Sequence, residues 1–335
     1  MVRMPGGIRM AALATLFVWQ SGCGGDKTCR GVIAIGEETQ HAALLKADGS
    51  LWEWDPGFAD PLPGPGASDA VGFANAQLCL RLSTGAVRCD PQRLTAVGPS
   101  DVADPREVSS WYEDNPTQVS LCAVTTDGTL TCRSPGETVF SPRAQDIRKV
   151  AIGAGHLCAV TVAGSMVCQP DPGGAPGWST AATDVTGAVE VVSLVEPRVS
   201  VVRTATGQLL SVNQGPPDGV SSPDEIVEIP ITGIDGEIKQ LVAGFNFACA
   251  LRTDGAIFCW SDADNLHARV ILRTTTNPKR WVPQRIASPR PATALAAGDL
   301  SVCALLDDTT VWCWGALGSE RKSGSPDGGF VMSCG

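Results

Sequence analysis

The sequence of 335 residues predicts an all-β protein built from a repeated hairpin. Glycine (37) and proline (24) are frequent, whereas the long Glu/Lys/Leu-rich stretches typical of helices are absent. Ten of the thirteen cysteines form five pairs with members ten residues apart, and a glycine follows the first cysteine by six residues in four of them. These observations together favour many short strands joined by tight turns.

Residues 1–22 have the pattern of an export signal. Arginines precede a short apolar run at Met10–Trp19 that is too short to span a bilayer. Small residues then precede Cys23, which resembles the bacterial lipoprotein signal, although Gln20 replaces the usual aliphatic residue. The resemblance implies that Cys23 is acylated and that residues 23–30 form a short tether; the alternative is ordinary secretion with Cys23 free or paired. We therefore expect an exported cell-envelope protein, an outer-membrane lipoprotein on the periplasmic or surface side.

The spacing of the cysteine pairs predicts disulfides across hairpins. If Thr126–Gly128 is a three-residue loop with glycine in the left-handed position, Cys122 faces Cys132 across two strands. Directly opposed cysteines can be bridged, and an exported protein meets the oxidising conditions in which such bonds persist. Zinc binding is disfavoured because C-x-x-C is absent and only three histidines are present. The predicted pairs are Cys79/Cys89, Cys122/Cys132, Cys158/Cys168, Cys249/Cys259 and Cys303/Cys313.

Two further copies of the hairpin lack both cysteines. The copy around Gly49 has Ala43 and Glu53 at those positions, and the copy around Gly207 has Val201 and Ser211. Loss of both members together is expected of a bonded pair. The seven turns lie near residues 49, 85, 128, 164, 207, 255 and 309, and a period near forty residues with several strands per unit is typical of a propeller. We expect one propeller over residues 31–335.

The repeat resembles that of the regulator of chromosome condensation family. Short apolar strands ending at Gly153 and Gly244 precede hairpins, and the last hairpin ends in Trp312-Cys-Trp314-Gly315. His41 and His156 stand at that family's histidine position. The resemblance implies a seven-bladed β-propeller of four-stranded antiparallel blades, with residues 281–286 as one of the outer strands. It also implies an interaction platform.

Closing such a ring requires a junction between the first and last blades. Cys29 and Cys334 remain after the five pairs and Cys23 are set aside, and they lie at the two ends of the predicted propeller. We hypothesise that they form a disulfide in place of the covalent link present at every other junction. The alternatives are that either one pairs with Cys23 or stays free.

No enzyme template is present in the sequence. The Gly-x-Ser-x-Gly elbow, the phosphate loop and the dinucleotide fingerprint are all missing, so neither catalytic nor cofactor-binding nor metal-binding residues are expected. A net charge of −10 disfavours nucleic-acid binding, and membrane contact is expected only through the lipid. We expect a binding or scaffold module for an unknown protein or glycan; the alternatives are a secreted inhibitor of an enzyme and a carbohydrate-active hydrolase.

Two segments are candidate binding surfaces. Trp111 and Tyr112 are adjacent aromatic residues in a segment expected to be an expanded loop, where aromatic side chains often anchor a partner; the alternative is packing inside the propeller. Lys279 and Arg280 belong to a basic segment that includes Arg269, Arg273, Arg285 and Arg290. This segment is either a solvated outer edge that discourages strand pairing or a contact for an anionic polymer or an acidic partner.

Overall fold

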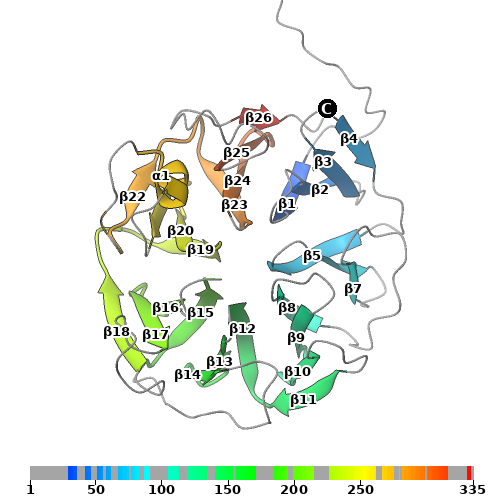
Figure 1. Cartoon of the computed structure of the whole chain (residues 1–335), viewed down its shortest axis with the longest axis vertical. Coiled ribbons are helices and arrows are strands. Elements are labelled where there is room, and N and C mark those ends of the chain that lie inside the picture. Colours follow the sequence, from blue (N-terminus) through cyan, green and yellow to red (C-terminus); the bar gives the residue numbers. More distant parts are fainter. Residues whose placement is uncertain are drawn as a thin grey trace, which may run out of the picture.

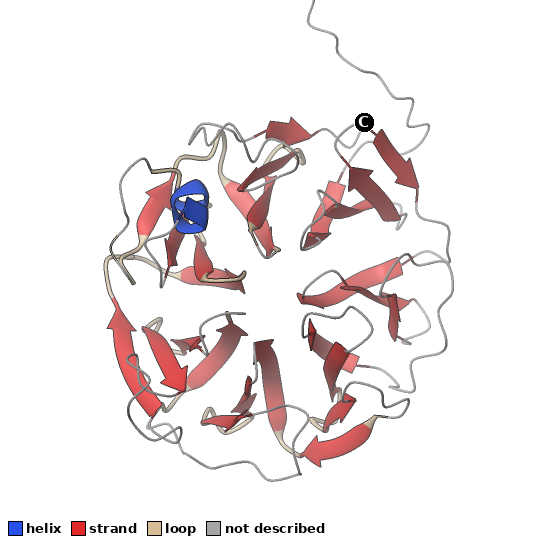
Figure 2. Cartoon of the chain, viewed as in Figure 1, coloured by secondary structure: helices blue, strands red, loops and turns tan. Residues whose placement is uncertain are grey.

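In the computed structural model, antiparallel β-sheets are arranged around a common centre (Figure 1). Strands make up nearly all of the regular structure (Figure 2). The all-β prediction is confirmed by this arrangement. The structure describes residues 29–35, 42–46, 51–55, 58–61, 67–74, 77–82, 87–90, 105–112, 119–133, 140–153, 156–170, 185–194, 199–214, 226–261, 266–274, 279, 281–298, 300–315 and 330–332.

Each of the seven sheets in these ranges begins with the strand nearest the common centre, which we call the inner strand (Figure 1). Apart from β8 (Pro105–Tyr112), the inner strands are rich in small or β-branched apolar residues, which suits a strand packed between neighbours. The inner strands are β1 (Cys29–Ile35), β5 (Ala67–Ala74), β8 (Pro105–Tyr112), β12 (Ile147–Gly153), β15 (Ala188–Ser193), β19 (Ile238–Ala243) and β23 (Ala292–Ala297).

A hairpin follows every inner strand and forms the middle of the sheet. The hairpins are β2 (Ala42–Lys46) with β3 (Leu51–Asp55), β6 (Gln77–Leu82) with β7 (Val87–Asp90), β9 (Val119–Thr125) with β10 (Leu130–Arg133), β13 (His156–Thr161) with β14 (Met166–Pro170), β16 (Val199–Thr204) with β17 (Leu209–Gln214), β20 (Phe247–Arg252) with β21 (Ile257–Ser261), and β24 (Ser301–Leu306) with β25 (Val311–Gly315).

Five sheets have a fourth, outermost strand. These strands are β4 (Phe58–Pro61), β11 (Ser141–Ala144), β18 (Ile226–Ile231), β22 (Gln284–Ile286) and β26 (Phe330–Met332). The expected four-stranded pattern holds in these five, whereas the sheets β5–β7 and β12–β14 show three strands within the described ranges. β22 occupies only the second half of the expected outer strand 281–286, because the backbone of Trp281 has a left-handed φ of 59° that interrupts the extended run.

The predicted hairpin geometry is confirmed. Cys122 lies opposite Cys132 and Val124 opposite Leu130. The amide of Thr125 donates to the carbonyl of Thr129 at 2.9 Å, which closes the three-residue loop, and Gly128 has a φ of 85°. The last hairpin keeps the same loop with Thr309 at a φ of 68°, so one turn accepts a side chain in the left-handed position. The cysteine-free pairs Ala43/Glu53 and Val201/Ser211 are also directly opposed.

The start of the first inner strand differs from the expected boundary. β1 begins at Cys29, inside the segment expected to be a tether, because Cys29 already pairs with Lys46 across the sheet. Every inner strand also has an irregularity near its start that the repeat pattern did not predict, as between Ile147 and Lys149 in β12. A β-bulge of this kind bends the strand and redirects the side chain that follows it.

The core lies between neighbouring sheets, because each middle strand presents alternate side chains to the sheet on either side. Cys249 and Leu251 pack with Val302 and Ala304 of the following sheet. Ala248 of the same strand packs instead with residues of the preceding sheet. Apolar burial on both faces explains why the middle strands are nearly continuous apolar runs, and it holds neighbouring sheets together.

Among the glycines of the described hairpin turns, Gly255 lies closest to the segment that leads into the next inner strand. A Cβ there would lie 2.6 Å from Pro291 Cβ and 2.9 Å from the amide nitrogen of Ala292, and φ is 83°. We expect Gly255→Ala to reduce the free energy of unfolding by about 3 kcal/mol, from left-handed strain plus steric overlap. Denaturant-induced unfolding measures this change.

Gly207→Ala is the matched control for this prediction. Gly207 has the same φ of 83° with no atom within 4 Å of a Cβ. It should therefore show the backbone strain alone, about 1 kcal/mol. Equal losses in the two variants would contradict a role for close approach between the turn and the next link.

Candidate interaction surfaces

The cysteine pairs form buried disulfides within the hairpins. Bonds join Cys122 to Cys132, Cys158 to Cys168, Cys249 to Cys259 and Cys303 to Cys313, and all eight residues are at most 2% exposed. Cys79 and Cys89 are opposed in the same register, which fits the fifth predicted pair. The eight bonded cysteines therefore belong to the packed framework and leave no exposed thiol in those four hairpins.

His156 also belongs to the framework. It is fully buried, and its Nε2 lies 3.3 Å from Ser200 Oγ of the next sheet. A Cβ on Gly153 would overlap the imidazole ring, so that glycine makes room for the histidine. Phe247 takes the same place two residues before Cys249 and packs over Gly244. Because phenylalanine occupies the same position in another hairpin, the position is one of packing.

The tryptophans of the last two sheets are buried as well. Trp260 lies in the core on the side of the preceding sheet, and Trp312 stacks on Trp314 with ring centroids 4.5 Å apart. The indole Nε1 of Trp314 donates to the carbonyl of Ile271 at 3.0 Å. These rings are therefore not available as exposed binding platforms.

A helix interrupts the basic segment, which the sequence did not predict. α1 (Leu266–Leu272) lies against β21 and β25, with Ile271 and Leu272 buried. The guanidinium of Arg273 lies 5.1 Å from the centre of the Trp312 ring. The start of the basic segment thus packs on the last sheet. The sequence had suggested only a solvated edge or a partner contact for this segment.

The hairpin turns and the links into the next inner strand lie at one end of the sheets, which we call the turn face. The amide of Ile147 donates to the carbonyl of Gly128 at 2.9 Å, and the amide of Ala292 donates to that of Gly255 at 3.0 Å. These bonds tie one sheet's turn to the start of the next sheet. Seven acidic side chains on these turns and links are exposed: Asp127, Asp146, Asp235, Glu237, Asp254, Asp307 and Asp308.

Three of these aspartates also stabilise their own turns. Oδ1 of Asp127, Asp254 and Asp308 accepts the backbone amide two residues later, at 3.1 Å in each case. Hydrogen bonds from Thr125 and then Thr129 lower the pKa of Asp127. Because this folded-state pKa is depressed, the carboxylate stays charged, and its turn bonds persist, until the pH falls through that lowered value.

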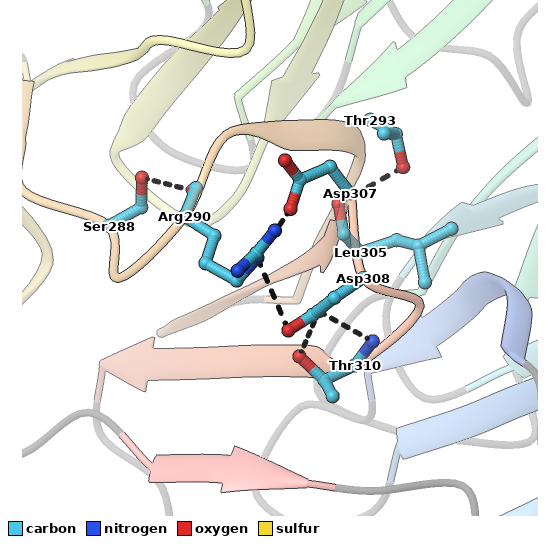
Figure 3. Close-up of polar contacts among 7 residues, drawn as sticks. All are labelled: Ser288, Arg290, Thr293, Leu305, Asp307, Asp308 and Thr310. Atoms are coloured by element: carbon cyan, nitrogen blue, oxygen red, sulfur yellow. Dashed lines mark hydrogen bonds and ion pairs between the residues drawn. The ribbon is translucent and has the colours of Figure 1, made fainter.

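An ion-pair cluster joins the last link to the last turn (Figure 3). Arg290 Nε lies 2.6 Å from Asp307 Oδ1 and 3.3 Å from Asp308 Oδ2. The hydrogen bond from Thr310 lowers the pKa of Asp308, and the bond to Asp307 raises the pKa of Arg290. The side chains are exposed, so solvent screens the pairing and the cluster serves mainly to orient the turn. The sequence showed Arg290 only as one more basic residue.

Polar side chains just after the bulges connect neighbouring inner strands. Glu107 pairs with Lys149 of the next inner strand at 2.6 Å, and Glu190 accepts the amide of Leu241 at 3.1 Å. Gln240 donates to the carbonyl of Leu295 at 2.8 Å and accepts that residue's amide at 2.9 Å. The Glu190 and Gln240 contacts satisfy backbone groups on the open edges of inner strands, whereas the Glu107–Lys149 contact is an ion pair between side chains. The signal in the sequence was a polar residue at the third position of the strand.

The predicted binding residues do not form one site. Trp111 and Tyr112 lie at the end of β8, where they pair with Ser120 and Val119 of β9, so the expectation that these two residues belong to an expanded loop is wrong. Lys279 is exposed, whereas Arg280 lies outside the described residues. Cys29 starts β1; Cys23 and Cys334 also lie outside the described residues.

Within the described ranges, His, Cys, Asp and Glu side chains form no group of three or more that could hold a metal ion. None of the helices in that part of the chain has the length and apolar character needed to cross a membrane.

The arrangement of the sheets defines a β-propeller, and solved structures share it. Human WBSCR16 matches with a TM-score of 0.60 at 13% identity, over 84% of this chain and 88% of that chain. The β-propeller domain of Cps50 (Swd1) from Myceliophthora thermophila matches at 0.57 and 10%, over 87% and 97%. The ectodomain of the receptor kinase CR4 from Physcomitrella patens matches at 0.54 and 16%, over 86% and 73%. At these identities the likeness establishes the fold alone.

Within this class, residues 238–265 match the regulator of chromosome condensation (RCC1) repeat. They span β19, the hairpin β20–β21 and the disulfide Cys249–Cys259. This match confirms the resemblance to RCC-type repeats drawn from the motifs. A comparison with curated protein sequences finds no match.

Proposed function

We propose that this chain is an exported, lipid-anchored binding module of the bacterial cell envelope that recognises a protein or glycan through the loops of a propeller face. RCC1-type propellers are associated with protein binding rather than with hydrolysis, which supports a scaffold role. The buried disulfides support an oxidising compartment, because such bonds are rare in reducing cytosol. Acylation at Cys23 attaches the module to the membrane.

The propeller of this proposal is a closed ring of seven blades. β1 of the first sheet packs against β23 and β24 of the last sheet, which supports closure. A bond between Cys29 and Cys334 then links the two ends of the chain at this junction.

The observation that supports the binding role is which residues are buried and which are exposed. The cysteines, His156 and the tryptophans Trp260, Trp312 and Trp314 are all buried in the framework, whereas charged side chains are exposed on the turn face. A rigid framework that presents exposed loops loses little conformational entropy on binding. The turn face is therefore the surface that we assign to recognition.

Capture from envelope extract tests the binding role. The double variant Asp235→Lys with Glu237→Lys reverses two exposed charges in one link of the turn face. We expect the native chain to recover a cross-linked partner and this variant to lose it, whereas Glu228→Lys, on the outer strand β18, should retain it. Equal recovery by the turn-face variant would contradict recognition through that face.

The N-terminus and the activity separate the alternatives. We expect the mass of the native N-terminus to show an acylated Cys23, and Cys23→Ala to abolish this acylation. A soluble, unacylated chain that blocks an enzyme would instead identify a secreted inhibitor. A purified chain that recovers no partner yet cleaves an envelope glycan would identify a carbohydrate-active hydrolase.

A further inference from the structure

The largest cluster of basic residues in the chain lies in residues 266–291. This segment carries six basic residues and no Asp or Glu, although the whole chain has a formal net charge of −10. Such a segment attracts negatively charged groups, and the attraction is greatest where the cations have no acidic neighbour in their own segment.

These cations differ in the contacts that they make within the chain. Arg273 donates to the carbonyl of Ala287 at 3.2 Å and lies over Trp312, while Arg290 pairs with Asp307 and Asp308. Lys279 and Arg285 are exposed and flank the start of β22. Within the part of the chain that the structure describes, neither forms an ion pair, so these two cations remain available to a partner.

β22 itself is the outermost strand of its sheet. Its three residues pair with β21 on one side, and no described strand pairs with the other side. Val282, between Lys279 and β22, is 44% exposed, one of two large apolar side chains that are exposed in the described ranges. A strand edge that pairs with no described strand, an exposed apolar side chain and two cations thus occur along one short run.

We infer that this run, residues 279–285, docks an extended acidic segment of a partner protein, which adds as a strand to the free edge of β22. Carboxylates of the segment pair with Lys279 and Arg285, and an apolar residue between them covers Val282. A peptide supplies the backbone donors and acceptors that an open strand edge needs, which an anionic polysaccharide does not. This surface lies on the outer edge of the propeller, so the inference goes beyond recognition at the turn face.

Fluorescence anisotropy with a labelled peptide of alternating Glu and Val tests the inference on the full chain. We expect saturable binding that weakens with added salt, as exposed ion pairs require. The double variant Lys279→Glu with Arg285→Glu should bind about tenfold more weakly or worse, since attraction becomes repulsion at two positions. Arg148→Glu is the matched control: Arg148 is an exposed cation on the inner strand β12, and its reversal should leave the affinity unchanged.

Two further probes separate strand addition from plain charge attraction. A peptide with proline at alternate positions cannot donate its share of backbone hydrogen bonds, so it should bind clearly more weakly than its parent. Polygalacturonate should bind no better than this proline peptide. Equal affinity for the proline peptide, tighter binding of polygalacturonate, or unchanged binding by the Lys279/Arg285 variant would each overturn the inference. None of these results bears on the turn face, which the Asp235/Glu237 variant tests separately.

Discussion

Replacing Cys29 and Cys334 together by alanine should lower the free energy of unfolding by about 5 kcal/mol, the largest effect that we expect of any change in this chain. The proposed bond closes a loop of roughly 300 residues, and restricting so long a loop removes much entropy from the unfolded state. The topology supports the pairing: β26 ends at Met332, two residues before Cys334, and β1 begins at Cys29. Their sheets are in contact.

The single variants provide the internal control for this prediction. Cys29→Ala and Cys334→Ala each remove the same bond, so each should lose as much stability as the double variant in denaturant-induced unfolding. Losses that add between the single variants would contradict a shared bond. Recovery of alkylated Cys29 from the non-reduced native chain would do the same, because it shows a free thiol.

Breaking the disulfide between Cys249 and Cys259 should lower the free energy of unfolding by about 3 kcal/mol. Its loop is short, so the entropic contribution is smaller than for the ring closure, but both cysteines are fully buried between two sheets. Cys249→Val with Cys259→Ser is the most conservative replacement, because Val201 and Ser211 occupy the same register elsewhere in the propeller. Thermal or denaturant-induced unfolding of the native and double-variant chains measures the loss.

A single change at this site should be at least as costly as the double change. Cys249→Ser leaves the buried thiol of Cys259 and adds a hydroxyl inside the apolar cluster that includes Leu251 and Ile257. We also expect the native bond to resist reductant until the chain unfolds, since neither cysteine is exposed to solvent. Rapid reduction under native conditions, or a double variant as stable as the native chain, would contradict this account.

The hairpins could be predicted because their geometry is local. A three-residue loop with glycine in the left-handed position places Cys122 opposite Cys132 whatever surrounds the hairpin, and the structure shows that register. The same reasoning held at Val201 and Ser211, where no cysteine is present. The position of His156 within the repeat was also evident from the sequence, and the structure shows that this position is one of packing.

The errors occurred where strand pairing or packing outside the hairpin decides the local structure. Trp111 and Tyr112 looked like a loop because they precede a polar, proline-containing stretch, yet β8 extends through them by pairing with β9. α1 was missed because it is a seven-residue helix and is held by packing, with its Ile271 carbonyl bonded to Trp314. A helix this short is marginal by itself and forms where tertiary contacts support it.

Spacing along the chain was therefore enough to define the turns, the opposed cysteines and the repeat, since each depends on residues within about a dozen positions of one another. The arrangement of the sheets decided the rest: which side chains cross from one sheet to the next, which cations are paired and which strand edge stays open. Glu190 contacts Leu241, and Gln240 contacts Leu295, only because separate sheets come together. Such contacts join residues about fifty positions apart, and no local pattern specifies which open edge each side chain will satisfy.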